Sequence, residues 1–197
     1  DPAMSCTRVV FTCKRVVLAI SCIACAPLCA QPEPGVPALL NVNGASDTGL
    51  DWNPELLWLG GSKWMAVWWS NDTLGGTTGQ DYDIFTATSF NHGTQWSSPL
   101  ALNANADLDA GDDVAPHLAA SGNVIIVAWH SNEDFSGLTS APDEDVVFIR
   151  SLNGGETWSE PAPLNSDSQS DSRQDRQVRL ATDGQGNWIA VWQAYLG

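Results

Sequence analysis

The chain repeats itself at a period of 62 residues. Three segments that start at Asn41, Asn103 and Asn165 align without a gap, and each is followed by an apolar run rich in Val, Ile and Trp. The first two units close on related stretches, SFNHGTQWSSP at 89–99 and SLNGGETWSEP at 151–161. A unit repeated in this way buries its apolar faces against its neighbours, so the repeat constrains the fold more than any single motif does.

The units read as strands and turns. Short apolar runs separated by Gly, Asn, Asp and Pro show almost no helical periodicity. In the second unit we expect four strands, over residues 116–120, 124–130, 145–150 and 158–164. A four-stranded sheet repeated every 40 to 65 residues or so is typical of a β-propeller blade. The sequence therefore predicts an all-β fold, a propeller of four-stranded antiparallel blades.

The blades can be placed along the chain. Residues 41–102 are predicted to form the first blade, 103–164 the second and 165–197 an incomplete third, about 2.7 blades in all. Residues 31–40 are a linker or the end strand of a preceding blade. Closed propellers have about 4 to 8 blades. We therefore interpret the chain as a fragment of a longer propeller.

The first 30 residues are predicted to be a leader outside the fold that does not pack on the blades. A basic stretch precedes an apolar run from Val16, and the small residue Ala30 follows, which is the order of a secretory signal peptide. The run is too short for a membrane span, which needs about 20 residues. We expect a secreted or periplasmic protein. A lipid anchor at Cys22 is the less favoured alternative.

The amino-acid composition restricts the kinds of partner that the protein can bind. All five cysteines lie in the leader, so the rest of the chain offers no disulfide and no thiolate metal site. Removing the leader leaves 5 basic and 22 acidic residues, a net charge of −17. Such a surface repels nucleic acid and anionic membranes at long range. The expected partner is a glycan or an extracellular protein, and the charge also suits cations.

The two closing stretches carry a family resemblance. The pattern Ser-x-Asp/Asn-x-Gly-x-Thr-Trp resembles the Asp-box of sialidase-type propellers, also called the bacterial neuraminidase repeat. One box is matched by Ser151, Asn153, Gly155, Thr157 and Trp158. The other is matched by Ser89, Asn91, Gly93 and Trp96, with Gln95 in place of Thr.

Each box is interpreted as structural. An Asn side chain can bond the backbone two residues on, and Gly permits a positive φ, so the pattern predicts a tight hairpin between the third and fourth strands. The Trp is expected to pack this turn onto the blade core. In the family that the boxes resemble, the box lies away from the active site.

Function is therefore sought at the other end of each blade. The loops from the second to the third strand, at 70–81 and 131–144, are expected there together with the acidic blade-to-blade runs. Loops on a rigid scaffold are where binding and catalysis concentrate.

Aspartates recur at two fixed positions in the blade-to-blade runs: Asp47, Asp109 and Asp171, then Asp51, Asp113 and Asp175. Side chains repeated in every unit are interpreted as turn formers. The alternative is calcium, bound by oxygen clusters such as Asp107, Asp109, Asp112 and Asp113. Their spacing does not match an EF-hand, so no metal or other cofactor is assigned.

The positions where the repeat is broken are the candidate binding site. Just inside the first strand, the equivalent residues are Glu55, His117 and Arg179, an acid, an imidazole and a permanent cation. We expect them at one end of the innermost strands, pointing to a common axial mouth on the face opposite Trp96 and Trp158. Neighbouring members should lie roughly 10 to 15 Å apart, given the spacing of packed sheets.

The third unit adds two further arginines, Arg173 and Arg176, where the other units have none. The planar guanidinium suits a carboxylate, the group that defines sialic acid. The other interpretation is that these arginines only pair with Asp171 and Asp175, as exposed ions commonly do.

Two functions are consistent with the sequence. The resemblance implies a sialidase-like glycoside hydrolase, with an arginine cluster for the substrate carboxylate, an acidic acid/base, and a Tyr nucleophile with a Glu. The chain departs from that pattern, because no Arg-Ile-Pro type motif precedes the first unit and its tyrosines are Tyr82 and Tyr195. The alternative is a non-catalytic exported propeller that binds glycan or protein or serves as a structural module. Catalytic residues stay unassigned.

Overall fold

The structure is a computed structural model that describes residues 17–18, 38–139 and 142–195. These residues form strands and turns and contain no helix. The strands make two four-stranded antiparallel sheets and two two-stranded sheets. The predicted all-β class with four-stranded antiparallel blades is confirmed for this part of the chain.

The first two sheets follow the order of the chain. In the first blade, neighbouring strands are β3 (Asp51–Trp58), β4 (Trp64–Ser70), β5 (Asp83–Ser89) and β6 (Leu100–Ala101). In the second blade they are β7 (Asp113–Ser121), β8 (Val124–Ser131), β9 (Asp145–Ser151) and β10 (Ala162–Pro163). The last sheet pairs β11 (Gln174–Thr182) with β12 (Trp188–Tyr195). Each sheet is thus an up-and-down meander.

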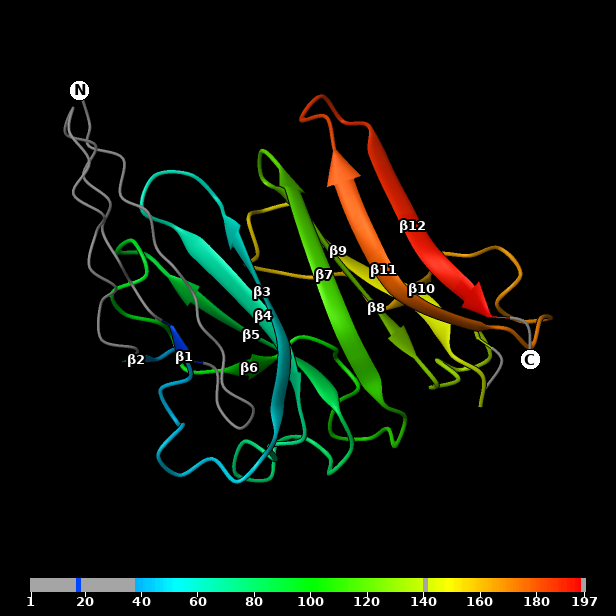
Figure 1. The fold of residues 1–197 in the computed structure, drawn as a ribbon, viewed down its shortest axis with the longest axis horizontal. Coiled ribbons are helices and arrows are strands. Elements are labelled where there is room, and N and C mark those ends of the chain that lie inside the picture. Colours follow the sequence, from blue (N-terminus) through cyan, green and yellow to red (C-terminus); the bar gives the residue numbers. More distant parts are fainter. Residues whose placement is uncertain (1–16, 19–37, 140–141, 196–197) are drawn as a thin grey trace.

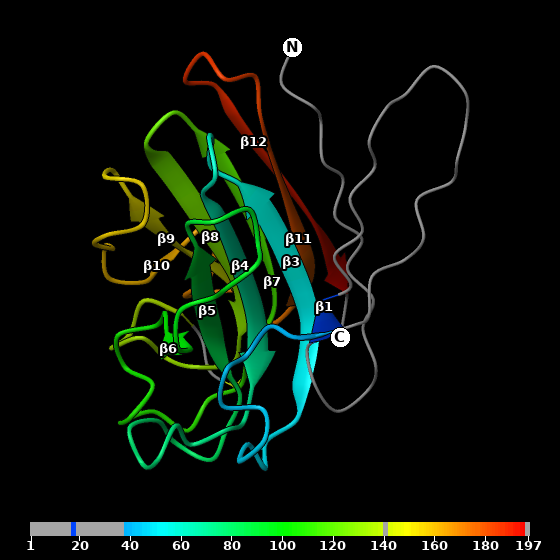
Figure 2. The same cartoon turned by 90° about the vertical axis from the view of Figure 1, so that its left-hand side faces the viewer.

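The first strands of the three sheets lie side by side. β7 contacts both β3 and β11, and the three run together across the molecule (Figure 1). Figure 2 places them along one side, while the short strands β6 and β10 lie at the opposite side. We call β3, β7 and β11 the inner strands, because the rest of each blade extends away from them.

Two strand boundaries differ from those predicted for the second blade. The inner strand β7 begins at Asp113 rather than at Pro116. The fourth strand, β10, is only Ala162–Pro163, so Trp158 lies outside it. Proline cannot donate to a ladder, and a proline-rich stretch therefore pairs only briefly at a sheet edge.

Apolar side chains pack between neighbouring blades. One core joins Val67 of the first blade to Val127 and Val147 of the second. A smaller core joins Val146 of the second blade to Val178 of β11. Each unit therefore buries its faces against its neighbours, as the repeat predicts.

The two ends of the blades differ. At one end, which we call the box end, His92 donates its backbone N–H to the carbonyl of Ser62, and Gly154 does the same to Asn123, so each box touches the hairpin between its blade's first two strands. The loops from the second to the third strand and from blade to blade meet at the opposite end, the loop end. This arrangement agrees with the predicted separation.

Hydrogen bonds within the boxes explain their pattern. In the second box, Ser151 Oγ accepts the N–H of Gly155 at 2.8 Å and donates to Asn153 Oδ1. Asn153 Oδ1 also accepts the N–H of Thr157 at 3.0 Å. The Asn side chain therefore reaches the backbone four residues on, not two as predicted. The Ser hydroxyl makes the two-residue contact instead, accepting the N–H of Asn153.

The first box keeps the same bonds despite its departure from the pattern. Asn91 Nδ2 donates to Gln95 Oε1, as Asn153 Nδ2 donates to Thr157 Oγ1. Gly93 adopts a φ of 79°. Trp96 and Trp158 are partly buried against the cores of their blades, as predicted for a packed turn.

A short pairing precedes the first blade. β1 (Val17–Leu18) pairs with β2 (Ala38–Leu39), and Leu40 is 2% exposed in a core with Trp68. β1 belongs to the predicted leader, and the other leader residues, Cys22 included, lie outside the described residues. Within the described ranges, no helix has the length and apolarity that a membrane crossing requires.

Candidate functional site

Each inner strand carries the same β-bulge. The ladder register shifts between Trp52 and Glu55, and at the equivalent points of β7 and β11. Between the two ladder pairs that flank the shift, the inner strand advances by three residues and its partner by two. The inner strand therefore contains one extra residue. The bulge places Asn53, Ala115 and Gln177 at positive φ values of 42°, 53° and 56°.

The bulge changes which side chains share a face. Trp52 pairs with Trp69 and Glu55 with Val67, and partners two residues apart on β4 face the same side. Trp52 and Glu55 therefore face the same side of the sheet although they are three residues apart. The repeated bulge gives the other two inner strands the same arrangement.

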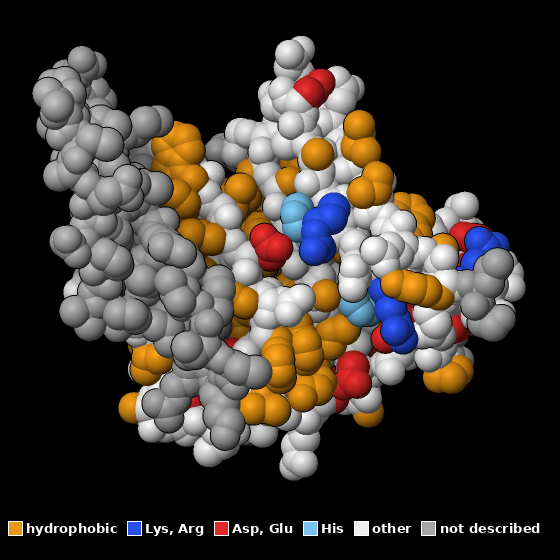
Figure 3. All heavy atoms as spheres, in the orientation of Figure 1, with side chains coloured by type: hydrophobic (Ala, Val, Ile, Leu, Met, Phe, Trp, Pro, Cys, Tyr) orange, Lys and Arg blue, Asp and Glu red, His pale blue; other side chains and the backbone are white. Residues whose placement is uncertain are grey.

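The three residues at the broken position lie in one register. Glu55 pairs with Val67, His117 with Ala128 and Arg179 with Val191, each at the same step of its ladder. They lie midway along the inner strands, so the predicted place at a strand end is wrong. The strands begin near the preceding Asp residues, which moves this register inward. In Figure 3, acidic, imidazole and basic side chains meet near the middle of the face over the inner strands.

The charge of Arg179 reaches both other members. Burial raises the pKa of Glu55, and Arg179 offsets part of that rise. Burial lowers the pKa of His117, and Arg179 lowers it further. His117 Nδ1 accepts the backbone N–H of Leu180 at 3.1 Å. The neutral imidazole therefore carries its proton on Nε2, where it can donate to a ligand.

Arg179 is the exposed member of this trio. One guanidinium nitrogen donates to the carbonyl of Val178 at 2.8 Å. A guanidinium has five N–H groups in a planar fork, so the others can bind a carboxylate or a hydroxyl pair.

An aromatic cluster lies nearer the loop end of the first blade. Trp52 and Trp69 are stacked, with ring centroids 5.8 Å apart, and Trp69 meets Tyr82 edge to face at 4.5 Å. All three side chains are partly exposed. A flat indole surface beside hydrogen-bonding groups is the composition of many ligand sites.

The equivalent positions of the second blade are polar. Ladder partners Val114 and His130 replace the two indoles, and Glu144 replaces Tyr82. His130 is 6% exposed, and burial, with help from the charge of Arg176, lowers its pKa to about 4. Arg176, the third blade's counterpart of Trp52, forms an ion pair with Glu144.

The structure separates the three candidate arginines. Arg173 pairs with Asp167 at 3.5 Å, both side chains being about half exposed. Arg176 pairs with Glu144 rather than with Asp175. The pairing expected with Asp171 and Asp175 is therefore replaced by other acids, although Asp171 Oδ1 accepts the backbone N–H of Arg173. Only Arg179 joins Glu55 and His117.

Sequence reasoning missed the aromatic cluster and His130. The repeat contained a signal for the aromatic cluster. Trp52, Val114 and Arg176 occupy equivalent positions, and they differ from one another as sharply as Glu55, His117 and Arg179 do. The sequence did not show the bulge, which places Trp52 on the same face of the sheet as Glu55.

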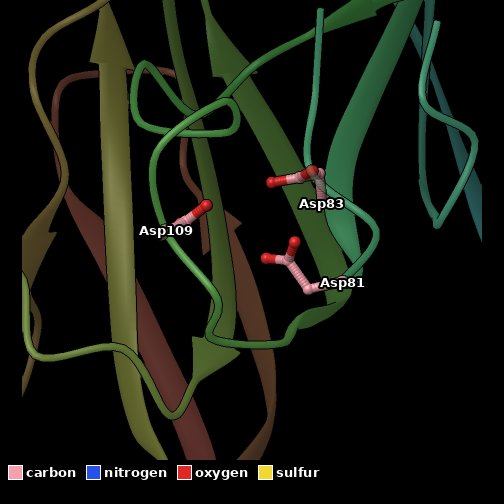
Figure 4. Close-up of side chains that lie close together, drawn as sticks. All are labelled: Asp81, Asp83 and Asp109. Carbon is pink, nitrogen blue, oxygen red and sulfur yellow. The ribbon is translucent and has the colours of Figure 1, made fainter. Parts of the chain in front are cut away.

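The calcium candidates do not form one cluster. Asp107 and Asp112 are exposed, and Asp112 Oδ1 accepts the N–H of Tyr82. Asp109 instead lies with Asp81 and Asp83, whose carboxylates point with it toward a common space (Figure 4). Sequence reasoning missed both partners, although the third strands begin on the repeated stretches DYD and DED.

Comparison with known proteins identifies the fold. No family model matches the chain, and no curated protein matches its sequence. Among solved structures, an α-L-arabinanase of Penicillium chrysogenum complexed with arabinobiose matches with a TM-score of 0.56 at 11% identity, over 95% of this chain and 52% of that one. An N-acetylgalactosamine deacetylase from F. plautii, in complex with blood group B trisaccharide, matches with a TM-score of 0.51 at 17% identity, over 76% and 46%.

The fold is a β-propeller. A Hadza microbial sialidase matches less well, with a TM-score of 0.49 at 14% identity, over 84% of this chain and 36% of that one. The chain spans about half the length of the arabinanase and of the deacetylase. At these identities the likeness concerns the fold, and function has to be argued from the site.

Proposed function

We propose that these blades belong to an exported glycan-binding propeller of sialidase type, whose site is the exposed face of the inner strands. One observation carries the proposal: an acid, a neutral imidazole and a guanidinium occupy one register of three adjacent strands, in a chain that otherwise repeats. A symmetric scaffold would not need this divergence, whereas an asymmetric ligand would.

The chemistry of the face suits an acidic sugar. Arg179 is exposed and can hold a carboxylate, and the Nε2 proton of His117 can donate to a hydroxyl. Trp52 and Trp69 offer apolar surface on the same face. Two solved propellers of this fold hold oligosaccharides, which supports a glycan as ligand by analogy of fold.

Hydrolysis is the second candidate, and Glu55 is the residue that favours it. Burial raises its pKa, which is the direction that favours the protonated form a general acid needs, and the charge of Arg179 opposes part of that rise. The two candidate functions are distinguished by one measurement, namely whether the protein cleaves the glycosidic bond of its ligand. Export follows from the pattern of the first 30 residues.

The test uses the natural full-length protein and two ligands that differ only in the acidic residue, sialyllactose and lactose. Arg179→Ala should weaken sialyllactose binding by about 1.5 to 3 kcal/mol in calorimetry, the range for a charged hydrogen bond. Arg173→Ala is the matched control, and its effect should be smaller because Arg173 lies in a solvated pair with Asp167. Unchanged affinity in the Arg179 variant would remove this face from the site.

Cleavage is measured separately with a fluorogenic sialoside. If the propeller is an enzyme, Glu55→Gln should lower kcat by at least about 100-fold, the lower bound for losing a general acid, while binding persists. Binding of sialyllactose without release of the fluorophore by the wild type would establish the non-catalytic alternative.

A further inference from the structure

Carboxylates gather at the same place in both blade junctions. At the first junction, Asp81, Asp83 and Asp109 each place a carboxylate oxygen within 4.8 Å of the others. At the second junction, the same is true of Asp145, Asp171 and Asp175. Aligned by the 62-residue period, the two sets share two positions, 83 with 145 and 109 with 171. Each set adds one more, 81 with 143 and 113 with 175, so four positions carry Asp in both units.

The fourth position supplies a deeply buried carboxylate at each junction. Asp113 is 0% exposed. The Ser131 hydroxyl and the Trp129 indole lie beside its carboxylate, but among the described residues neither makes a hydrogen bond of normal geometry to it. Asp109 and Asp83 lie close enough for their charges to act on this carboxylate. Asp175 is 4% exposed, belongs to the second cluster itself, and leaves its Oδ1 without a partner in the same part of the chain.

Further buried oxygens face the same spaces without a donor. Among the described residues, Asp81 Oδ2, Asp109 Oδ1 and Asp171 Oδ2 have no hydrogen-bond partner. Unpartnered buried carboxylate oxygens are costly, and proteins normally satisfy them with a donor or a cation. At each junction such oxygens belong to a group of carboxylates contributed by two neighbouring blades, which suits a shared ligand.

Among the described residues, no basic side chain forms an ion pair with the first cluster. The ion pairs found in the described ranges join Arg173 to Asp167 and Arg176 to Glu144. The fold thus holds several acids together at a cost that a divalent cation would remove.

The start of the first blade provides an internal contrast. Asp47 and Asp51 are the equivalents of Asp109 and Asp113, but no acidic residue stands 62 positions before Asp81 or Asp83. There Asn41 Nδ2 donates to both carboxylates, at 2.9 and 3.0 Å. The equivalent Asn103 donates to Asp83, and Asn165 donates to Asp145 and Asp175. One amide is thus present at all three places, and at the two junctions it meets a larger set of acids.

We propose that one calcium ion binds at each of the two blade junctions, held by the carboxylates of the four repeated positions. Calcium takes six to eight oxygen ligands and accepts irregular geometry, which suits four aspartates completed by water. Asp109 also lines a cleft of ≈ 460 Å³ with Asn105 and Glu133, which gives an ion and its waters a way in.

Such an ion would join two blades. Asp81 and Asp83 lie at the start of β5 in the first blade, whereas Asp109 and Asp113 lead into β7 of the second. The ion would thus reinforce the backbone hydrogen bond from Asp113 N–H to the carbonyl of Tyr82, 2.7 Å long. It would fix the spacing of the inner strands from the loop end.

The test titrates calcium chloride into the natural full-length protein after EDTA treatment and removal of the chelator. Calorimetry should show saturable binding with a Kd of about 1 mM or tighter, the range of extracellular calcium modules. The Tm should rise with calcium, because an ion that binds only the folded state stabilises it. Sodium chloride of matched ionic strength should not reproduce the rise.

Two variants make the test specific. Asp109→Asn should reduce the bound calcium by one ion per chain and remove part of the Tm rise. Asp47→Asn, at the equivalent position without the extra acids, should change neither. Both keep the side-chain volume, and the Asp109 variant relieves repulsion, so folding should survive, which circular dichroism checks. Absence of saturable binding, an equal effect of sodium chloride, or equal losses in both variants would overturn the proposal. None of these outcomes depends on glycan binding.

Discussion

The backbone N–H of Leu180 donates a hydrogen bond of 3.1 Å to Nδ1 of His117, across the junction between the second and third blades. A backbone amide can only donate, so Nδ1 must be unprotonated for this bond to exist. The contact therefore couples the protonation state of a candidate ligand-binding residue to the packing of two blades. It also directs the remaining ring proton, on Nε2, away from the junction.

This contact predicts how His117 titrates. The imidazole should be the Nε2–H tautomer at neutral pH, and its pKa should lie below the usual value of 6.5, since burial and then the charge of Arg179 both disfavour the cation. Arg179→Ala should raise that pKa. Nitrogen chemical shifts and an NMR titration measure both, and a proton found on Nδ1 at neutral pH would contradict the contact.

His130 should make the protein sensitive to acid. Burial first, and then Arg176, lowers its pKa to about 4 in the folded state, against 6.5 when unfolded. A lowered histidine pKa means that stability is fully present above pH 6.5 and is lost as the pH falls toward 4. The loss attributable to this group is about 3 kcal/mol at most.

His130→Gln isolates that loss, because Gln193 is the natural residue at the equivalent position of the third blade. The variant's free energy of unfolding should fall less than that of the wild type between pH 7 and pH 4. Denaturant titrations at several pH values give the difference, in which the contributions of other acidic groups cancel. Parallel pH curves for the two proteins would show that His130 is not responsible.

Trp52 should contribute to ligand binding through its indole face. Trp52→Val installs the residue found at the equivalent position of the second blade, Val114. Glycan affinity should weaken by about 0.5 to 1.5 kcal/mol, the range of an aromatic contact. Quenching of tryptophan fluorescence by the sugar should also decrease. Leu152→Ala, an exposed apolar residue of the second box, is the control that should leave affinity unchanged.

The boxes should matter for stability and not for binding. Ser151 is 0% exposed, and its hydroxyl bonds both Asn153 and Gly155. Ser151→Ala should therefore lower the free energy of unfolding by about 1 to 3 kcal/mol, because buried partners lose their hydrogen bonds. Glu156→Ala, an exposed change in the same turn, should stay within about 0.5 kcal/mol. Chemical denaturation compares the two, and equal effects would contradict the structural role.

Gln95→Thr tests the departure of the first box from its pattern. Gln95 accepts a hydrogen bond from the side-chain amide of the Asn in its box, and Thr157 does the same in the other box. The exchange should therefore change the free energy of unfolding by no more than about 0.5 kcal/mol. A loss of several kcal/mol would show that the two turns are not equivalent.

The sequence by itself determined the features that depend on neighbouring residues. The repeat, the central strands of each blade and the turn between the third and fourth strands follow from local periodicity and turn chemistry, and the structure has all three. The broken position at Glu55, His117 and Arg179 could also be found by alignment, because a repeat exposes its own exceptions.

Tertiary structure decided what depends on residues far apart in the chain. The bulge at Asn53 adds one residue to the inner strand, and a one-residue shift reverses which face every later side chain occupies. Periodicity therefore could not place Trp52 beside Glu55. Asp83 and Asp109 meet only because two blades pack against each other, and the position of their carboxylates is set by that packing rather than by their spacing in the sequence.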